Sequence, residues 1–283
     1  MSAVTATDRL AAHRSFFAQL VSASAGVPPT ETRIQEAFAA TPRERFVGEG
    51  PWHVFTRAGY IQTPNDDPAF LYQDVPIALK REEQINNGQP TLHAACLAAL
   101  AVKPGETAVH VGAGTGYYTA LLARLTGPAG AVHAYEIHPE LAARATEILA
   151  DHPNVTVHPR SGTAGPLPAC DVLYVNAGAT APPDVWLDAL RPGGRLLFPL
   201  TSAAGPGAML LVSRADDDRF AARFVCPAMF IPCAGARDDE TAQRLTEAFQ
   251  RGNLAGVRSL HRATPPDSTC WVAGRGWWLS TGA

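Results

Sequence analysis

The chain has 283 residues, of which 46% are hydrophobic and 17% charged, and its formal net charge is −3. This composition is typical of a globular protein with a substantial core, and the lack of a basic run excludes an electrostatic footprint for nonspecific nucleic-acid binding. No apolar run has the length of a membrane span, and the N-terminus lacks the features of a signal peptide. The five cysteines form no C-x-x-C pair, so we expect reduced thiols in a cytoplasmic protein.

The first hundred residues are predicted to form helices around a long irregular segment. Apolar residues recur at helical spacing over residues 8–23 and 30–40, and prolines follow both stretches. Residues 47–90 are rich in proline, asparagine, aspartate and aromatic residues, and so long a segment without regular structure is usually functional. An alanine-rich helix is expected over residues 91–101. We therefore assign residues 1–104 to an N-terminal region that carries the substrate and active-site loop.

Strands and helices alternate from residue 105 onward. The expected elements are a strand over 107–111, a helix over 117–125, a strand over 131–135, a helix over 139–150, strands over 155–158 and 171–175, a helix over 184–190, and strands over 195–198, 209–214 and 220–225. This order predicts an α/β fold over residues 105–235, with a Rossmann-like, mostly parallel seven-stranded sheet and helices on both faces. Residues 236–283 form a C-terminal extension packed on this core, with a helix over 240–250 and a further strand over 270–280.

A glycine-rich turn between the first strand and the first helix of this core indicates a nucleotide site. Gly112, Gly114 and Gly116 are spaced G-x-G-x-G, and Glu136 follows the next strand, twenty residues after Gly116. A dinucleotide fingerprint needs a small residue where Tyr117 stands, so the turn makes no demand for a pyrophosphate on the helix N-terminus. We therefore expect S-adenosylmethionine (AdoMet) rather than NAD, with Glu136 accepting hydrogen bonds from both ribose hydroxyls.

Other candidate cofactor residues fall at the ends of the predicted strands, where ligands of such sheets bind. Ser161 and Gly162 follow the third strand and Asn176 ends the fourth, near the expected position of the transferred methyl group. His110 precedes the glycine turn, and it is either a cofactor contact or a hydrogen-bonded core residue. Tyr117 either contacts the methionine end of the cofactor or packs its helix.

Several stretches outside the glycine turn resemble the protein-L-isoaspartate O-methyltransferase family. They are PRERFV at 42–47, which is similar to the family's "PRE-x-FV", YQDVPI at 72–77, similar to "Y-x-D-x-P-I", QINNGQPTLHA at 84–94, similar to the "TIS-x-P-x-x-x-A" loop and helix, and the later landmarks LRPGGR at 190–195 and FIP at 230–232. The resemblance covers roughly residues 36–233 and implies a class I AdoMet-dependent methyltransferase.

The chain departs from this family at the reaction site. Asn86 stands where the family has a serine or threonine associated with the reaction, and one residue is inserted at Asn87 and Gly88. The family's acid before the glycine turn is His110 here, and Ser161 replaces the aspartate of its Asp-Gly pair. The resemblance implies that residues 84–90, named here the asparagine loop, close over the reacting centre.

The catalytic candidates are therefore three amide side chains of the asparagine loop, Gln84, Asn86 and Asn87. Asparagines before a glycine are also turn chemistry, so the loop either presents amides to a carboxylate or simply turns the chain. A carboxylate acceptor is already ionised at neutral pH and needs no general base. The sequence offers no ligand cluster for a metal, and none is expected.

The predicted function is that of an AdoMet-dependent O-methyltransferase acting on a carboxylate of a peptide, protein or small natural product. One alternative is a true L-isoaspartyl repair methyltransferase, and another is a non-catalytic AdoMet-binding protein. A hydroxyl acceptor would require a base such as His53 or His93. No nucleic-acid or membrane partner is expected, and the oligomeric state stays open.

Overall fold

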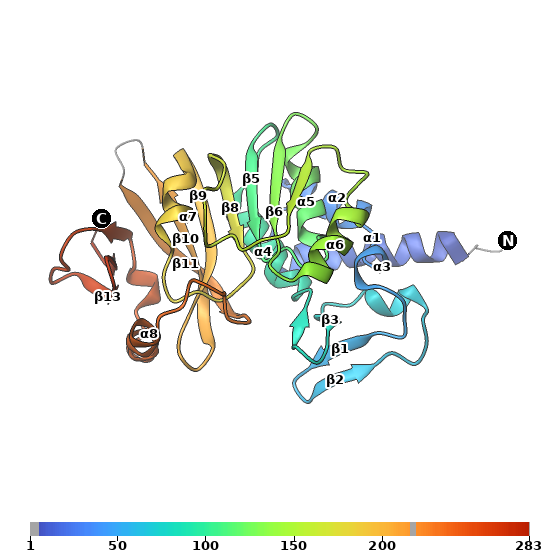
Figure 1. Ribbon diagram of the computed structural model, residues 1–283. Helices are drawn as coiled ribbons and strands as arrows, with labels where there is room; N and C mark the ends of the chain where they lie inside the picture. Colours follow the sequence, from blue (N-terminus) through green and yellow to red (C-terminus); the bar gives the residue numbers. More distant parts are fainter. Residues whose placement is uncertain (1–5, 216–218, 283) are drawn as a thin grey trace.

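A ten-stranded sheet forms the centre of the computed structural model, which describes residues 6–215 and 219–282 (Figure 1). Its strands are β5 (Thr107–Val111), β6 (Ala131–Tyr135), β7 (Val155–His158), β8 (Cys170–Val175), β9 (Leu190–Thr201), β10 (Pro206–Arg214), β11 (Phe220–Met229), β12 (Ser259–Arg262), β13 (Cys270–Gly274) and β14 (Trp277–Ser280). Neighbouring strands follow the order β13-β14-β12-β11-β10-β9-β8-β5-β6-β7. In this spatial order, the neighbours β9, β8, β5, β6 and β7 pair in parallel. The neighbours from β9 through β10, β11, β12 and β14 to β13 pair in the antiparallel sense.

The predicted fold class is confirmed, with β5 to β11 as the seven expected strands, but the sheet is longer than predicted. The C-terminal extension adds β12, β14 and β13 beyond β11. The expected single strand over residues 270–280 is instead a hairpin, because the chain reverses at Gly276, whose φ of +78° glycine tolerates. Leu260, Trp271 and Leu279 are at most 5% exposed and share a core with the central strands, so their burial holds the extension on the sheet.

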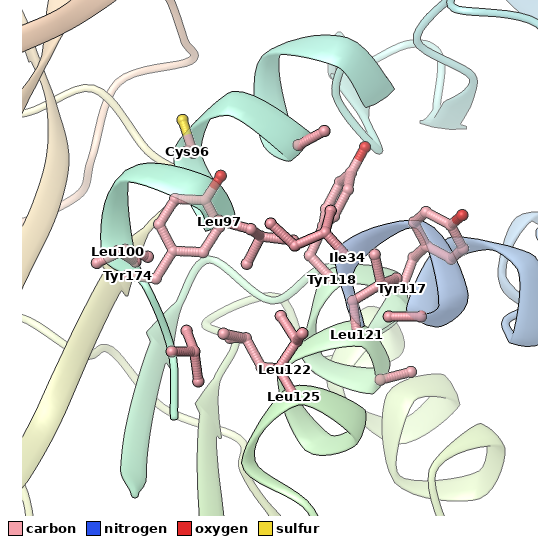
Figure 2. Packing of buried hydrophobic residues seen from close by; sticks show 14 of the residues in the cluster. Ile34, Cys96, Leu97, Leu100, Tyr117, Tyr118, Leu121, Leu122, Leu125 and Tyr174 are labelled. Atoms are coloured by element: carbon pink, nitrogen blue, oxygen red, sulfur yellow. The ribbon is translucent and has the colours of Figure 1, made fainter. Parts of the chain in front are cut away.

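Helices cover both faces of the sheet. They are α1 (Ala6–Ser24), α2 (Thr32–Ala40), α3 (Glu44–Val47), α4 (Pro90–Leu100), α5 (Tyr117–Thr126), α6 (Pro139–Ile148), α7 (Asp184–Ala189) and α8 (Asp239–Arg251), with 3-10 turns η1 (Pro68–Leu71) and η2 (Leu254–Gly256). Side chains alternate along a strand, so Val172 joins the core under α1 to α6, whereas Leu173 joins the core under α7 and α8. Figure 2 shows part of the first core, in which Tyr118 and Tyr174 lie among leucines of α4 and α5. None of the helices in residues 6–215 and 219–282 is long and apolar enough to cross a bilayer.

The segment between α3 and α4 contains only short elements. They are β1 (His53–Thr56) with β2 (Gly59–Gln62), η1, and β3 (Ala78–Lys80) with β4 (Ile85–Asn86). Figure 1 shows this segment beneath the sheet, on the side of α3 and α6. Arg43 is fully buried and donates to the carbonyl oxygens of Leu71, Gln73 and Val75 at 2.5, 2.7 and 3.2 Å. The arginine of the PRERFV motif therefore ties the irregular segment to the core.

Candidate active site

The glycine turn requires its glycines for conformation and for space. Gly112, Gly114 and Gly116 have φ values of +76°, +57° and +93°, a region that other residues rarely adopt. A β-carbon at Gly112 would lie 3.3 Å from the backbone carbonyl of Asn176, and one at Gly116 would lie 2.6 Å from a methyl group of Leu149. The turn therefore packs against the end of β8 on one side and against α6 on the other.

Glu136 follows β6, and its carboxylate is oriented by two backbone groups. One oxygen accepts the Gly114 N–H at 2.7 Å, and the other accepts the His138 N–H at 2.8 Å. Each carboxylate oxygen has a second lone pair, which leaves one acceptor position per oxygen for a ribose hydroxyl. The neighbouring Ile137 is 57% exposed, so an apolar surface suited to adenine adjoins the carboxylate. This pair of residues fits the adenosine half of AdoMet.

His110 lies on β5 and is fully buried, with both ring nitrogens held by protein groups. Its Nδ1 is 2.8 Å from Oγ1 of Thr119, and its Nε2 is 2.8 Å from Nδ2 of Asn176. The ring stacks on Tyr174 with a centroid distance of 5.5 Å. Burial lowers the pKa of His110 to about 3, so the imidazole is neutral near pH 7. The hydrogen bond to Asn176 links the ring to the predicted cofactor site.

Tyr117 begins α5, and Ser161 and Gly162 follow β7. The ring of Tyr117 packs edge-on against Phe38 and Phe46, and Figure 2 shows it beside an N-terminal helix. Gly162 lies against β5, because a β-carbon there would be 2.6 Å from Val111. Ser161 accepts the Thr163 N–H at 3.1 Å through its hydroxyl, which shapes this loop. Their predicted cofactor contacts stay predictions.

The two asparagine side chains of the asparagine loop both support the backbone and carry amide donors. The Oδ1 of Asn86 accepts the Gly88 N–H at 2.9 Å, as expected for a turn, and its Nδ2 donates to the hydroxyl of Tyr60 at 3.3 Å. The Oδ1 of Asn87 accepts the Ile77 N–H at 2.8 Å. Its buried Nδ2 has no hydrogen-bond partner among the described residues. Both asparagines therefore use the oxygen for structure and keep the nitrogen as a donor.

Two contacts position the asparagine loop and its neighbouring strand β3, and neither was predicted from the sequence. The carboxylate of Asp74 accepts the Thr91 N–H at 2.7 Å and a Gln89 side-chain N–H at 2.9 Å, which fixes the start of α4. Leu79 of β3 lies against Gly114, because a β-carbon added at Gly114 would be 3.1 Å from a methyl group of Leu79. Asp74, the acid of the YQDVPI motif, could have indicated the contact with Thr91 and Gln89. No sequence pattern indicates the contact of Leu79 with Gly114.

A cavity of about 290 Å³ adjoins the asparagine loop. It is lined by Phe55, Gly59, Tyr60, Arg81, Glu82 and Gln84. Tyr60 also binds Asn86, so the cavity continues from the loop. Gln84 belongs to this lining and has a φ of +59°, an uncommon value for a residue other than glycine. The cavity is a candidate place for the part of an acceptor that flanks its reacting group.

Of the two histidines considered as bases, His93 is poorly suited to that role. The Nε2 of His53 lies 3.4 Å from the guanidinium of Arg81. His93 is 1% exposed, and its Nδ1 lies 2.6 Å from the hydroxyl of Tyr174. Burial places the pKa of His93 well below its usual range. A β-carbon at Gly88 would lie 2.1 Å from its Nε2, so the asparagine loop covers this nitrogen. Among residues 6–215 and 219–282, no three histidine, cysteine or acidic side chains cluster in a way that suits a metal.

Comparison with known proteins assigns the chain to a family. The family model for protein-L-isoaspartate(D-aspartate) O-methyltransferase matches residues 22–238. A protein-L-isoaspartate O-methyltransferase of Brucella anthropi is 31% identical over 207 residues, which cover 72% of this chain and 87% of that protein. Its counterpart in Anaeromyxobacter dehalogenans is 33% identical over 210 residues, covering 71% and 89% of the two chains.

Solved structures agree on the fold. One protein-L-isoaspartate O-methyltransferase superposes with a TM-score of 0.66 at 22% identity, covering 84% of this chain and 69% of its own. A putative protein-L-isoaspartate O-methyltransferase from Plasmodium falciparum, in complex with S-adenosyl-L-homocysteine, superposes with a TM-score of 0.61 at 17% identity, covering 78% and 98%. The predicted methyltransferase class and the predicted cofactor, AdoMet, are thereby confirmed. The chain belongs to the protein-L-isoaspartate(D-aspartate) O-methyltransferase family.

Proposed function

We propose that the protein methylates the free carboxylate of L-isoaspartyl residues in peptides and proteins. The observation that carries this proposal is the asparagine loop, which keeps the amide nitrogens of Asn86 and Asn87 as donors and pairs with β3, whose Leu79 lies against the glycine turn. The names of the relatives favour this acceptor over a small natural product. The family match also extends across the asparagine loop as well as the cofactor site, which supports the same acceptor.

The reaction needs orientation rather than proton transfer. Bound AdoMet supplies a methyl group on a positively charged sulfur, which is reactive without further activation. An oxygen of the acceptor carboxylate forms the new C–O bond as the C–S bond breaks and its electron pair stays on sulfur. The products are a methyl ester and S-adenosylhomocysteine, and no proton moves because the carboxylate is ionised at neutral pH. The protein therefore contributes mainly by holding the two reactants in line and excluding water.

The residues divide this task between the two reactants. Glu136 and Ile137 form the surface for the adenosine half of the cofactor. The unpartnered Nδ2 of Asn87 is a buried donor that a carboxylate oxygen of the acceptor would satisfy. Asn86 and Tyr60 lead from this point to the 290 Å³ cavity, which has room for residues beside the methylated one. That room favours a peptide over an isolated carboxylate.

A hydroxyl acceptor is disfavoured by the state of His93. His93 is buried and neutral, and its free nitrogen lies behind Gly88. His93 therefore cannot readily accept a proton from a bound alcohol. The Nε2 of His53 lies 3.4 Å from the guanidinium of Arg81. A carboxylate acceptor avoids this requirement.

A matched set of peptides tests the proposal. The same sequence is prepared with L-isoaspartate, L-aspartate or D-aspartate at one position and incubated with methyl-labelled AdoMet. We expect base-labile methyl ester on the L-isoaspartyl peptide and none on the L-aspartyl peptide, and the D-aspartyl peptide reports whether the second acceptor in the family's name is shared. Absence of label on that peptide, in protein that binds S-adenosylhomocysteine, would overturn the acceptor assignment while leaving the cofactor assignment intact.

Substitution of Asn87 tests the loop directly. Asn87→Asp keeps the oxygen that accepts the Ile77 N–H but replaces the free donor by a negative charge. Repulsion of the acceptor carboxylate should raise its KM about tenfold or more, with unchanged affinity for S-adenosylhomocysteine. Asn65→Asp is the control, because Asn65 is exposed and uses its oxygen in the same way, on the Asp67 N–H. An equal effect of both substitutions would contradict a special role for Asn87.

A further inference from the structure

The carboxamide of Asn176 has one half held and the other half without a partner. Asn176 follows β8, and its backbone N–H donates to the carbonyl of Val111 at 2.8 Å, beside the glycine turn. Its Nδ2 lies 2.8 Å from Nε2 of His110. Its Oδ1 is buried and has no hydrogen-bond partner among the described residues. A buried acceptor without a partner is costly, so a ligand that donates to it is the simplest explanation.

Hydrogen-bond logic fixes the direction of this carboxamide. An amide nitrogen only donates, so Nε2 of His110 accepts and carries no proton. A neutral imidazole then carries its proton on Nδ1, which donates to Oγ1 of Thr119 at 2.8 Å. Stacking of the imidazole on Tyr174 limits its rotation. The polar chain Thr119–His110–Asn176 thus orients the carboxamide with its nitrogen on His110 and leaves its oxygen as the unpartnered acceptor.

The order of the strands indicates what meets this oxygen. The adenosine surface of Glu136 and Ile137 lies at the end of β6, with the glycine turn of β5 between it and β8. Neighbouring strands are about 4.8 Å apart, so the end of β8 lies roughly 10 Å from that of β6. A cofactor whose ribose is bound at β6 and which crosses the glycine turn brings its amino-acid end to β8. That end carries an ammonium group, which donates hydrogen bonds and is positively charged.

We propose that Asn176 accepts a hydrogen bond from the amino group of the cofactor's methionine moiety, and that His110 and Thr119 are positioning residues that orient its carboxamide. The inference rests on AdoMet as the cofactor and not on the identity of the acceptor. It assigns the buried polar chain a function in cofactor selection: the protein distinguishes ligands that carry the amino-acid group from those that end at the thioether.

Two ligands separate this role from general support of the fold. S-adenosylhomocysteine carries the amino group, whereas 5′-methylthioadenosine shares the adenosine and sulfur but lacks the amino-acid part. Asn176→Leu should weaken S-adenosylhomocysteine binding about tenfold or more and change 5′-methylthioadenosine binding less than about twofold, as measured by calorimetry. Equal losses for both ligands, or none for either, would overturn the assignment of Asn176. These outcomes do not depend on methyl transfer, so they are distinguishable from failure of the proposed acceptor.

Variants at His110 test the positioning role. His110→Leu leaves Nδ2 of Asn176 without an acceptor and should reproduce the selective loss of S-adenosylhomocysteine binding. His110→Gln retains an acceptor and should lie closer to the wild type than His110→Leu does. Identical behaviour of these two variants in folded protein would overturn the orienting role of His110. If His110→Leu does not fold, Thr119→Val replaces it in the test, because valine keeps the shape of the threonine side chain. We expect Thr119→Val to give a weaker loss that is again selective for S-adenosylhomocysteine. An equal effect on both ligands would contradict the proposal.

Discussion

Replacement of Glu136 by glutamine should separate cofactor binding from folding. The carboxylate is 7% exposed and accepts the N–H groups of Gly114 and His138 at 2.7 and 2.8 Å. Glutamine supplies only one oxygen, so its amide nitrogen faces one of these backbone donors and one ribose hydroxyl. The loss of one or two charge-assisted hydrogen bonds should cost about 2–4 kcal/mol of binding free energy, or roughly 30- to 1000-fold in affinity.

Calorimetric titration with S-adenosylhomocysteine measures this loss. Glu140→Gln is the matched control, because the side chain of Glu140 is 75% exposed and pairs with Lys80 on the surface. Without ligand, the midpoint temperature of thermal unfolding of Glu136→Gln should fall by a few degrees, since the hydrogen bond from the Gly114 N–H is weakened. An affinity of Glu136→Gln within about twofold of that of Glu140→Gln would refute the assignment of the ribose site to Glu136, because the estimated loss exceeds that margin.

Three further predictions follow from burial. Ile137→Ser should lower S-adenosylhomocysteine affinity about fivefold or more, whereas Ile61→Ser should not, although the two isoleucines are 57% and 56% exposed. His110 has a pKa of about 3 in the folded protein and near 6.5 when unfolded, so the unfolded state gains a proton as the pH falls below 6.5. This histidine alone should remove up to about 5 kcal/mol of stability by pH 3, and denaturant unfolding of His110→Gln should show a shallower acid decline. Arg43→Met should destabilise by about 3 kcal/mol or more in denaturant unfolding, because three backbone carbonyls lose the donor that the buried guanidinium supplies, and Arg43→Lys should lie between it and the wild type.

The parallel part of the fold was predictable because its signals are local. Each βα unit carries its own apolar strand, glycine or proline turn and amphipathic helix, so the predicted strand 107–111 and helix start at Tyr117 coincide with β5 and α5. The glycine turn and Glu136 were recognisable for the same reason, since a fixed spacing in sequence becomes a fixed position at adjacent strand ends.

The predictions failed or stopped where contacts join distant residues. His110 and Asn176 are 66 positions apart in sequence, and only the parallel pairing of β5 with β8 brings them together. Arg43 meets the Leu71 carbonyl across 28 positions, and no local pattern marks a buried arginine that binds backbone oxygens. The tail was expected to form a single strand, although Gly274, Arg275 and Gly276 interrupt its apolar residues, and the hairpin depends on pairing with β12.

The departure at Asn86 is compatible with the reaction of the family. In the proposed reaction, position 86 shapes a tight turn and faces the acceptor, and an asparagine side chain carries an acceptor and a donor on one rigid plane. Its oxygen accepts the Gly88 N–H, which supports the turn, and its nitrogen donates toward Tyr60 beside the cavity. Asn87 repeats this division, with its oxygen on Ile77 and its nitrogen free. The change from a hydroxyl to an amide therefore keeps a hydrogen-bond donor at the reaction site, and because the acceptor carboxylate is already ionised, no proton acceptor is lost with the hydroxyl.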